Sequence, residues 1–253
     1  GSNGGTVTIT GIVGPNPLND GVRIDGNVTT TGNQNIQIYS NRLNITGGAS
    51  INSGSGTTQL LPASNGFEVN VGGADSPGAL GIADGELDRI SAGTILVGST
   101  TSGLLTVSAP ITSGNHLFLQ SGSGAVVQNS IAMAANRNLR IETLGANLGT
   151  LSLATADADL SASGTGAITL ISPRDIVLTP GSSVATVNGS INLSANQNSL
   201  PTPGSFSGID VNAANLSSTG TGSLILWGRG GNGTGDQHGI RVRGGASLTT
   251  AGQ

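Results

Sequence analysis

The stretch HLFLQSGSGAVVQ, residues 116–128, holds two short segments in which apolar and polar side chains alternate, joined by serine and glycine. Alternation with a period of two indicates β-strands with one buried face, and the glycine-rich junction indicates a tight corner. The segment NLRIE, residues 138–142, repeats the first pattern, with Leu139 in the place of Leu117. A strand that returns after about 22 residues suits one coil of a three-sided solenoid, in which each coil lies on the one before it.

Alternating segments of this kind occur along the whole chain. They include TVTIT at 6–10, NIQIY at 35–39, FEVNV at 67–71, AITLI at 167–171, SINLS at 190–194 and SLILW at 223–227. Leu105 and Val126 repeat nearly the same coil spacing, and no stretch of ten or more residues has apolar positions at helical spacing. We therefore predict an all-β chain folded as a right-handed parallel β-helix of about a dozen rungs, roughly 55–60 Å long at a rise of ~4.8 Å per rung.

The composition agrees with a narrow core of small aliphatic side chains. The chain has 43 glycines among 253 residues, 2% aromatic and 9% charged residues, but still 35% hydrophobic residues. A disordered chain would have fewer apolar residues and a higher net charge. A β-propeller would show aromatic signatures in each blade, which are missing here.

Charge and cysteine content exclude several classes of function. There is no lysine, the nine basic residues are arginines, and the formal net charge is −4. A nucleic-acid partner is therefore not expected. The chain has no cysteine, hence no disulfide or thiolate metal site, and no apolar run near the ~20 residues of a membrane span. Its start, GSNGGTVTIT, has no signal-peptide features, so we expect the export signals of an exported parent to lie outside this piece.

A repeat links the two ends of the chain. Val7 and Ile9 align with Leu224 and Leu226, and a weaker copy begins at Gly189. The related glycine-rich units cover residues 5–32, 189–221 and 222–253. We interpret 1–253 as a single β-helix segment of a longer protein that repeats after roughly 217 residues, the offset between Gly5 and Gly222.

Two stretches resemble a known family. GELDRISAGTILVGSTTSGLLTVSAPIT, residues 85–112, and GSLILWGRGGNGTGDQHGIRVRGGASLTTAG, residues 222–252, are similar to recurrent patterns of the large bacterial exoproteins related to filamentous haemagglutinin. The resemblance implies a right-handed parallel β-helix, export, and a role at the cell surface or outside the cell. It does not name a ligand.

Two groups of acids are candidates for an enzyme site. They are Asp84, Glu86 and Asp88, and Asp157 and Asp159. Enzymes that cleave polysaccharides work with paired carboxylates, and on β-helices these lie on adjacent rungs. The first group lies in a segment that looks like a turn, where Arg89 can pair with a neighbour. We favour the turn, predict no catalytic residue, and expect no enzyme activity.

Metal and cofactor sites are not expected. The loop GGNGTGDQHG, residues 230–239, has one imperfect match, at Asp236, to a glycine-aspartate calcium repeat, and we interpret it as a glycine-rich loop. His116 and His238 have no second ligand at metal spacing. Trp227 ends an alternating segment beside Arg229, and this pair is the candidate carbohydrate contact, through ring stacking or a cation–π platform.

The sequence thus predicts a structural rod or spacer within a large, secreted or surface-displayed, adhesin-like bacterial fibre. Its expected partners are neighbouring repeats of the same protein, a second copy bound end to end, and host or cell-surface carbohydrate or protein. Membrane insertion is not expected. The alternative is a β-helix that binds or cleaves polysaccharide along a lateral groove.

Overall fold

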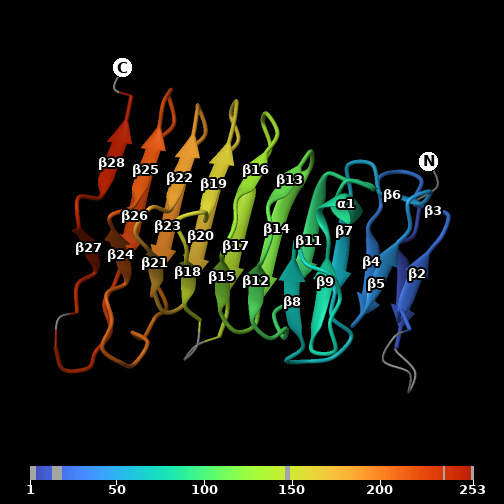
Figure 1. The fold of residues 1–253 in the computed structure, drawn as a ribbon, viewed down its shortest axis with the longest axis horizontal. Helices are drawn as coiled ribbons and strands as arrows, with labels where there is room; N and C mark the ends of the chain where they lie inside the picture. The colour runs from blue at the N-terminus through green and yellow to red at the C-terminus, as the bar shows by residue number, and fades with distance from the viewer. Residues whose placement is uncertain (1–3, 13–18, 146–148, 236, 252–253) are drawn as a thin grey trace.

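The chain folds into a parallel β-helix of nine stacked coils (Figure 1). The structure is a computed structural model, and it describes residues 4–12, 19–145, 149–235 and 237–251. Most coils contribute one strand to each of three faces, and the strands of each face pair in parallel. The predicted solenoid is therefore confirmed.

The first face is a single parallel sheet that runs the length of the stack. In spatial order, which is also chain order, its strands are β1 (Val7–Gly11), β4 (Ile36–Ser40), β7 (Thr57–Leu61), β11 (Thr94–Gly98), β14 (His116–Ser121), β17 (Leu139–Thr143), β20 (Ile168–Ser172), β23 (Ile191–Ala195) and β26 (Leu224–Gly228). We call it the nine-stranded face.

The other two faces are each divided in the third coil. The second face holds β2 (Val22–Ile24) and β5 (Leu43–Ile45), then β9 (Ala79–Ile82), β8 (Glu68–Val71), β12 (Leu105–Val107), β15 (Ala125–Val127), β18 (Leu151–Leu153), β21 (Ile176–Leu178), β24 (Ile209–Asn212) and β27 (Ile240–Arg243). The third face holds β3 (Asn27–Thr29), β6 (Ser50–Asn52) and β10 (Ile90–Ser91), then β13 (Ile111–Ser113), β16 (Ile131–Met133), β19 (Asp159–Ala162), β22 (Ser183–Thr186), β25 (Asn215–Ser218) and β28 (Ser247–Thr250).

The predicted number of rungs was too high, because the coils differ in length. Leu117 pairs with Leu139 in the next coil, as predicted. Thr57 instead pairs with Thr94, so the coil between them is much longer. Nine strands at ~4.8 Å give a stack about 38 Å long between its first and last strands. This is shorter than the predicted rod. A second detail also differs, since Leu105 pairs with Ala125 and not with Val126.

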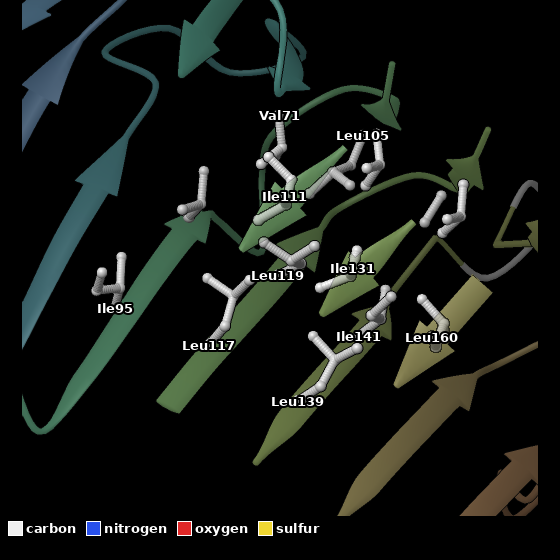
Figure 2. Packing of buried hydrophobic residues seen from close by; sticks show 14 of the residues in the cluster. Val71, Ile95, Leu105, Ile111, Leu117, Leu119, Ile131, Leu139, Ile141 and Leu160 are labelled. Atoms are coloured by element: carbon white, nitrogen blue, oxygen red, sulfur yellow. The ribbon is translucent and has the colours of Figure 1, made fainter. Parts of the chain in front are cut away.

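The core consists of aliphatic side chains stacked on their equivalents in the next coil. Leu117 lies next to Leu139 on one inner face, while Ile111, Ile131 and Leu160 form a column on another (Figure 2). All five are at most 1% exposed. Burial of such a side chain stabilises the fold by ~1.5–3 kcal/mol. Each inward side chain lies one strand spacing from its equivalent in the next coil. Branched aliphatic side chains fit this spacing, which explains why aromatic residues are scarce.

Asparagine side chains tie successive coils together at the corners. The Asn35 Oδ1 atom accepts the backbone N–H of Thr57 at 2.9 Å, and that of Asn138 accepts the N–H of Ala167 at 2.9 Å. These hydrogen bonds satisfy backbone N–H groups at the corners, outside the hydrogen-bonded ladders of the strands. The many asparagines next to strands therefore have a structural role.

An insertion in the third coil, residues 72–89, divides the second and third faces. It contains β9, which lies between β8 and β5, and the single-turn helix α1 (Asp84–Leu87), which contacts β13. We call residues 72–89 the seam. The expectation that helix is essentially absent holds apart from this turn, and no helix among the described residues is long and apolar enough to cross a membrane.

Candidate functional site

The seam acids bind backbone groups at strand edges. Glu86 Oε1 accepts the N–H of Ile45 at 2.9 Å, and Oε2 accepts that of Ala83 at 3.0 Å. Arg89 Nη1 donates to the Ile45 carbonyl oxygen at 3.0 Å, so the two side chains pair both backbone groups of Ile45. Asp84 Oδ1 accepts the N–H of Thr112 at 2.7 Å. These side chains replace the ladder bonds that the divided sheets lack.

On the third face, an asparagine that the sequence did not predict bridges the two parts of the divided face. Asn115 Nδ2 donates to the carbonyl oxygen of Ile90 at 2.9 Å, and its Oδ1 accepts the N–H of Ala92 at 2.9 Å. The amide thus joins β10 to the corner between β13 and β14, which are not paired with β10. The only signal in the sequence was the position of Asn115 directly before an alternating segment.

The remaining acid candidates, one of them inside the seam and two outside it, do not bind the strand edges there. Asp88 and Asp157 are exposed, and Asp159 Oδ1 accepts the hydroxyl of Ser183 at 2.5 Å. Asp159 lies in β19 of the sixth coil, whereas the seam belongs to the third. Among the described residues, no group of three His, Cys, Asp or Glu side chains could hold a metal ion.

The two histidines lie in different coils. His116 points outward from β14, and its Nδ1 accepts the N–H of Asn138 at 2.9 Å. Partial burial, together with the nearby Arg137, lowers the pKa of His116 below its usual value and favours the neutral ring. His238 precedes β27 of the ninth coil. Asp236, the residue of the calcium hypothesis, lies outside the described residues.

Trp227 and Arg229 lie two residues apart in the ninth coil but have different surroundings. Trp227 points outward from β26 and is 65% exposed. Arg229 follows the strand, and its Nη2 donates to the carbonyl oxygen of Asn198. The cation–π contacts found among the described residues involve other side chains, with Arg140 5.1 Å from the Phe118 ring centroid and Arg174 4.8 Å from that of Phe206.

The outward positions of the nine-stranded face form two columns along the stack. The first column is Thr8, Gln37, Gln59, Leu96, Phe118, Arg140, Thr169, Asn192 and Ile225. The second includes Thr10, Tyr39 and Leu61, then Gly98, Gln120, Glu142, Ile171, Ser194 and Trp227. Rings, amides and one ion pair thus share this face.

The outward columns of the other faces carry smaller side chains over most of their length. On the third face the column is Thr112, Ala132, Ser161, Ala185, Ser217 and Thr249. On the second face it runs through Thr106, Val126, Ser152 and Val177 before Asp210. Among the described residues, the nine-stranded face therefore presents the widest variety of outward side chains.

Among the described residues, shallow hollows lie along the nine-stranded face at three places that concern the outward columns. The largest of the three, about 360 Å³, is lined by residues that include His116, Phe118, Asn138 and Arg140. Arg140 Nη2 lies 3.0 Å from Glu142 Oε1. Glu142 also borders the second hollow, of about 180 Å³, which extends to Ser194.

The third hollow lies at the end of the stack. Its volume is about 220 Å³, and Asn192, Ser194, Ile225 and Trp227 line it. Because Ser194 borders both the second and third hollows, and the Arg140–Glu142 pair links the first and second, the three form one lateral track from β11 to β26. We call it the track.

Comparisons of the chain with family models, with curated proteins and with solved structures gave no match. The resemblance to filamentous haemagglutinin-related exoproteins therefore stays a prediction from the sequence.

Proposed function

We propose that this chain is a rod-forming spacer of a large, secreted or surface-displayed, adhesin-like bacterial fibre. The proposal rests on the outer strand edges and the inward apolar side chains of the first and ninth coils. Among the described residues, each has strands that lack a partner on their outer side. The ninth coil also exposes apolar side chains of the kind that an inner coil buries. Such an edge accepts another coil, from the same polypeptide or from a second copy.

The ninth coil exposes its inward side chains on one side. Ile240 is 41% exposed and Val242 48%, whereas their ladder partners Ile209 and Val211 in the eighth coil are fully buried. The edge of β27 away from β24 has no strand partner among the described residues. A tenth coil in register would bury these two side chains as the ninth buries those of the eighth.

The first coil is more covered at the other end, where Val22 and Ile24 are only 6% and 5% exposed and Val7, Ile9 and Val28 are partly buried. Ile9, Val22, Ile24 and Val28 line a hollow of about 260 Å³ between the strands of this coil. Its edge faces the direction opposite to that of the ninth coil, because all coils run in the same sense. Stacking at the two ends is therefore head to tail, which adds length without closing a ring.

The way in which adjacent coils pair also supports the proposal, because it follows the sequence repeat. Ile191 pairs with Leu224, and Ile209 pairs with Ile240, so residues that align in the repeat are ladder partners in adjacent coils. A unit related to the ninth coil also forms the first coil. Similar coils at both ends suit a protein that extends by repetition.

A distance measurement tests the stiffness that a spacer needs. The chain lacks cysteine, so Thr8→Cys and Ile225→Cys place spin labels in one column, eight strand spacings or about 38 Å apart. We expect a narrow distance distribution, and a shorter one of about 29 Å for Thr8→Cys with Thr169→Cys, six spacings apart. Broad distributions that do not scale with strand number would refute the rod.

A further inference from the structure

The nine-stranded face concentrates the aromatic side chains that point outward. The chain has three Phe, one Tyr and one Trp. Tyr39, Phe118 and Trp227 all lie in the outward columns of this face. By contrast, Phe67 packs against the core, and the Phe206 ring lies under Arg174. Most of the few rings are therefore placed on one lateral surface.

The track supplies hydrogen-bonding groups beside these rings. Asn138 lines the hollow at Phe118, and Asn192 lines the hollow at Trp227. Binding sites for small molecules and sugars combine apolar and aromatic walls with a few fixed polar groups. The two ring-bearing ends of the track, on β14 and β26, are four strand spacings or about 19 Å apart. A ligand that contacts both ends must be extended along the axis of the stack.

The charge of the track favours an uncharged ligand. The charged side chains that line it are Arg140 and Glu142, which form an ion pair, and the lowered pKa of His116 favours its neutral form. The Arg140 guanidinium also covers the Phe118 ring. A polyanion would find no cluster of free cations here, and a polycation no cluster of free acids.

We propose that the track binds an extended, uncharged polysaccharide, which lies along the stack axis with one sugar ring against Trp227 and another against the stacked side chains of Phe118 and Arg140. The amides of Asn138 and Asn192 hydrogen bond to sugar hydroxyls, and Arg140 holds the Phe118 ring in place. Binding involves no cleavage. The inference is independent of the rod proposal, because the track uses outward side chains and the rod uses coil edges.

Calorimetric titration with soluble hexasaccharides tests the proposal. The probes are uncharged hexamers of glucose, mannose, galactose and N-acetylglucosamine, with a hexamer of galacturonic acid as the charged comparison. We expect at least one uncharged hexamer to bind, and to bind more tightly than its disaccharide. Trp227 is the only tryptophan, so its fluorescence should change on binding.

Substitutions in the track, with a control on another face, test where the hexasaccharide binds. Phe118→Ala, Trp227→Ala and Arg140→Gln should each weaken binding by at least about five-fold. Val177→Ala, an outward residue of the second face, should leave it unchanged and serves as the control. The proposal is overturned if no uncharged hexamer binds at millimolar concentration, if the galacturonic acid hexamer binds best, or if the track variants bind as well as the control. Loss of binding with unchanged sedimentation would separate this site from the coil edges.

Discussion

The carboxylate of Glu86 accepts the backbone N–H of Ile45 at 2.9 Å, across 41 residues of chain. Ile45 ends the short strand β5, whose sheet has only two strands. At this edge an acidic side chain therefore takes the place of a missing strand. A residue that could have been a catalytic acid in the sequence holds two parts of the solenoid together.

The first prediction follows from this contact. Glu86→Ala leaves the N–H groups of Ile45 and Ala83 without their acceptor, so we expect the free energy of unfolding to fall by about 1–3 kcal/mol. Asp88→Ala removes an exposed acid two residues away and should change it by less than about 0.5 kcal/mol. Urea denaturation followed by circular dichroism measures both, and equal effects would contradict the role of Glu86.

Asp75, also in the seam, predicts a dependence of stability on pH. Burial raises the pKa of this carboxyl to about 6, although the N–H of Gly81, 2.8 Å from Oδ1, favours the ionised form. Because the folded pKa lies above the unfolded one, the folded state binds the proton more tightly. The stability that Asp75 contributes is therefore greatest below about pH 4 and is lost as the pH rises to about 6 and above.

Asp75→Asn tests this dependence, because the amide oxygen can still accept from Gly81 without a charge. We expect the variant to match the original protein at pH 4 and to be more stable by about 1 kcal/mol at pH 7.5, after allowance for solvent screening at this half-exposed group. Thermal unfolding at a series of pH values gives the difference. A difference that is the same at every pH would refute the assignment.

A glycine corner gives a third prediction. A Cβ atom on Gly189 would lie 1.8 Å from the carbonyl oxygen of Gly166 in the preceding coil. Gly189→Ala should force the two coils apart and lower the free energy of unfolding by about 1–3 kcal/mol. A Cβ on Gly114 meets nothing within 4 Å, so Gly114→Ala should be nearly neutral. Similar stability of the two variants would show that the corners are looser than described.

Much of the fold could be predicted because each coil repeats a simple local pattern. The alternation in HLFLQ and NLRIE determines which side chains face the core, and their spacing determines the pairing of Leu117 with Leu139. The number of coils could not be predicted in the same way. The seam lengthens the third coil, and its strand β9 lies between β8 and β5, out of chain order. Local periodicity does not report such long-range placement.

The track could not be predicted for the same reason. Phe118 and Arg140 belong to successive coils and become neighbours only through the register of β14 and β17. The pairing suggested by the sequence, Trp227 with Arg229, joined residues close in the chain. In the folded chain Arg229 instead binds the carbonyl oxygen of Asn198. Outward side chains follow no hydrophobic pattern, so their partners depend on the exact coil lengths.

The central claim is that the coil edges accept further coils, and sedimentation velocity of the 253-residue chain tests it most directly. Val242 is 48% exposed at the edge of the ninth coil, so Val242→Asp should place a charge in the stacking surface. Val126→Asp, an outward residue in the middle of the second face, is the matched control and should leave stacking intact.

From micromolar to near-millimolar concentration, we expect the weight-average sedimentation coefficient to rise with concentration, with a frictional ratio that increases as rods lengthen. Val242→Asp should suppress the rise, and Val126→Asp should not. A chain that sediments as an unchanging monomer over this whole range would contradict the account.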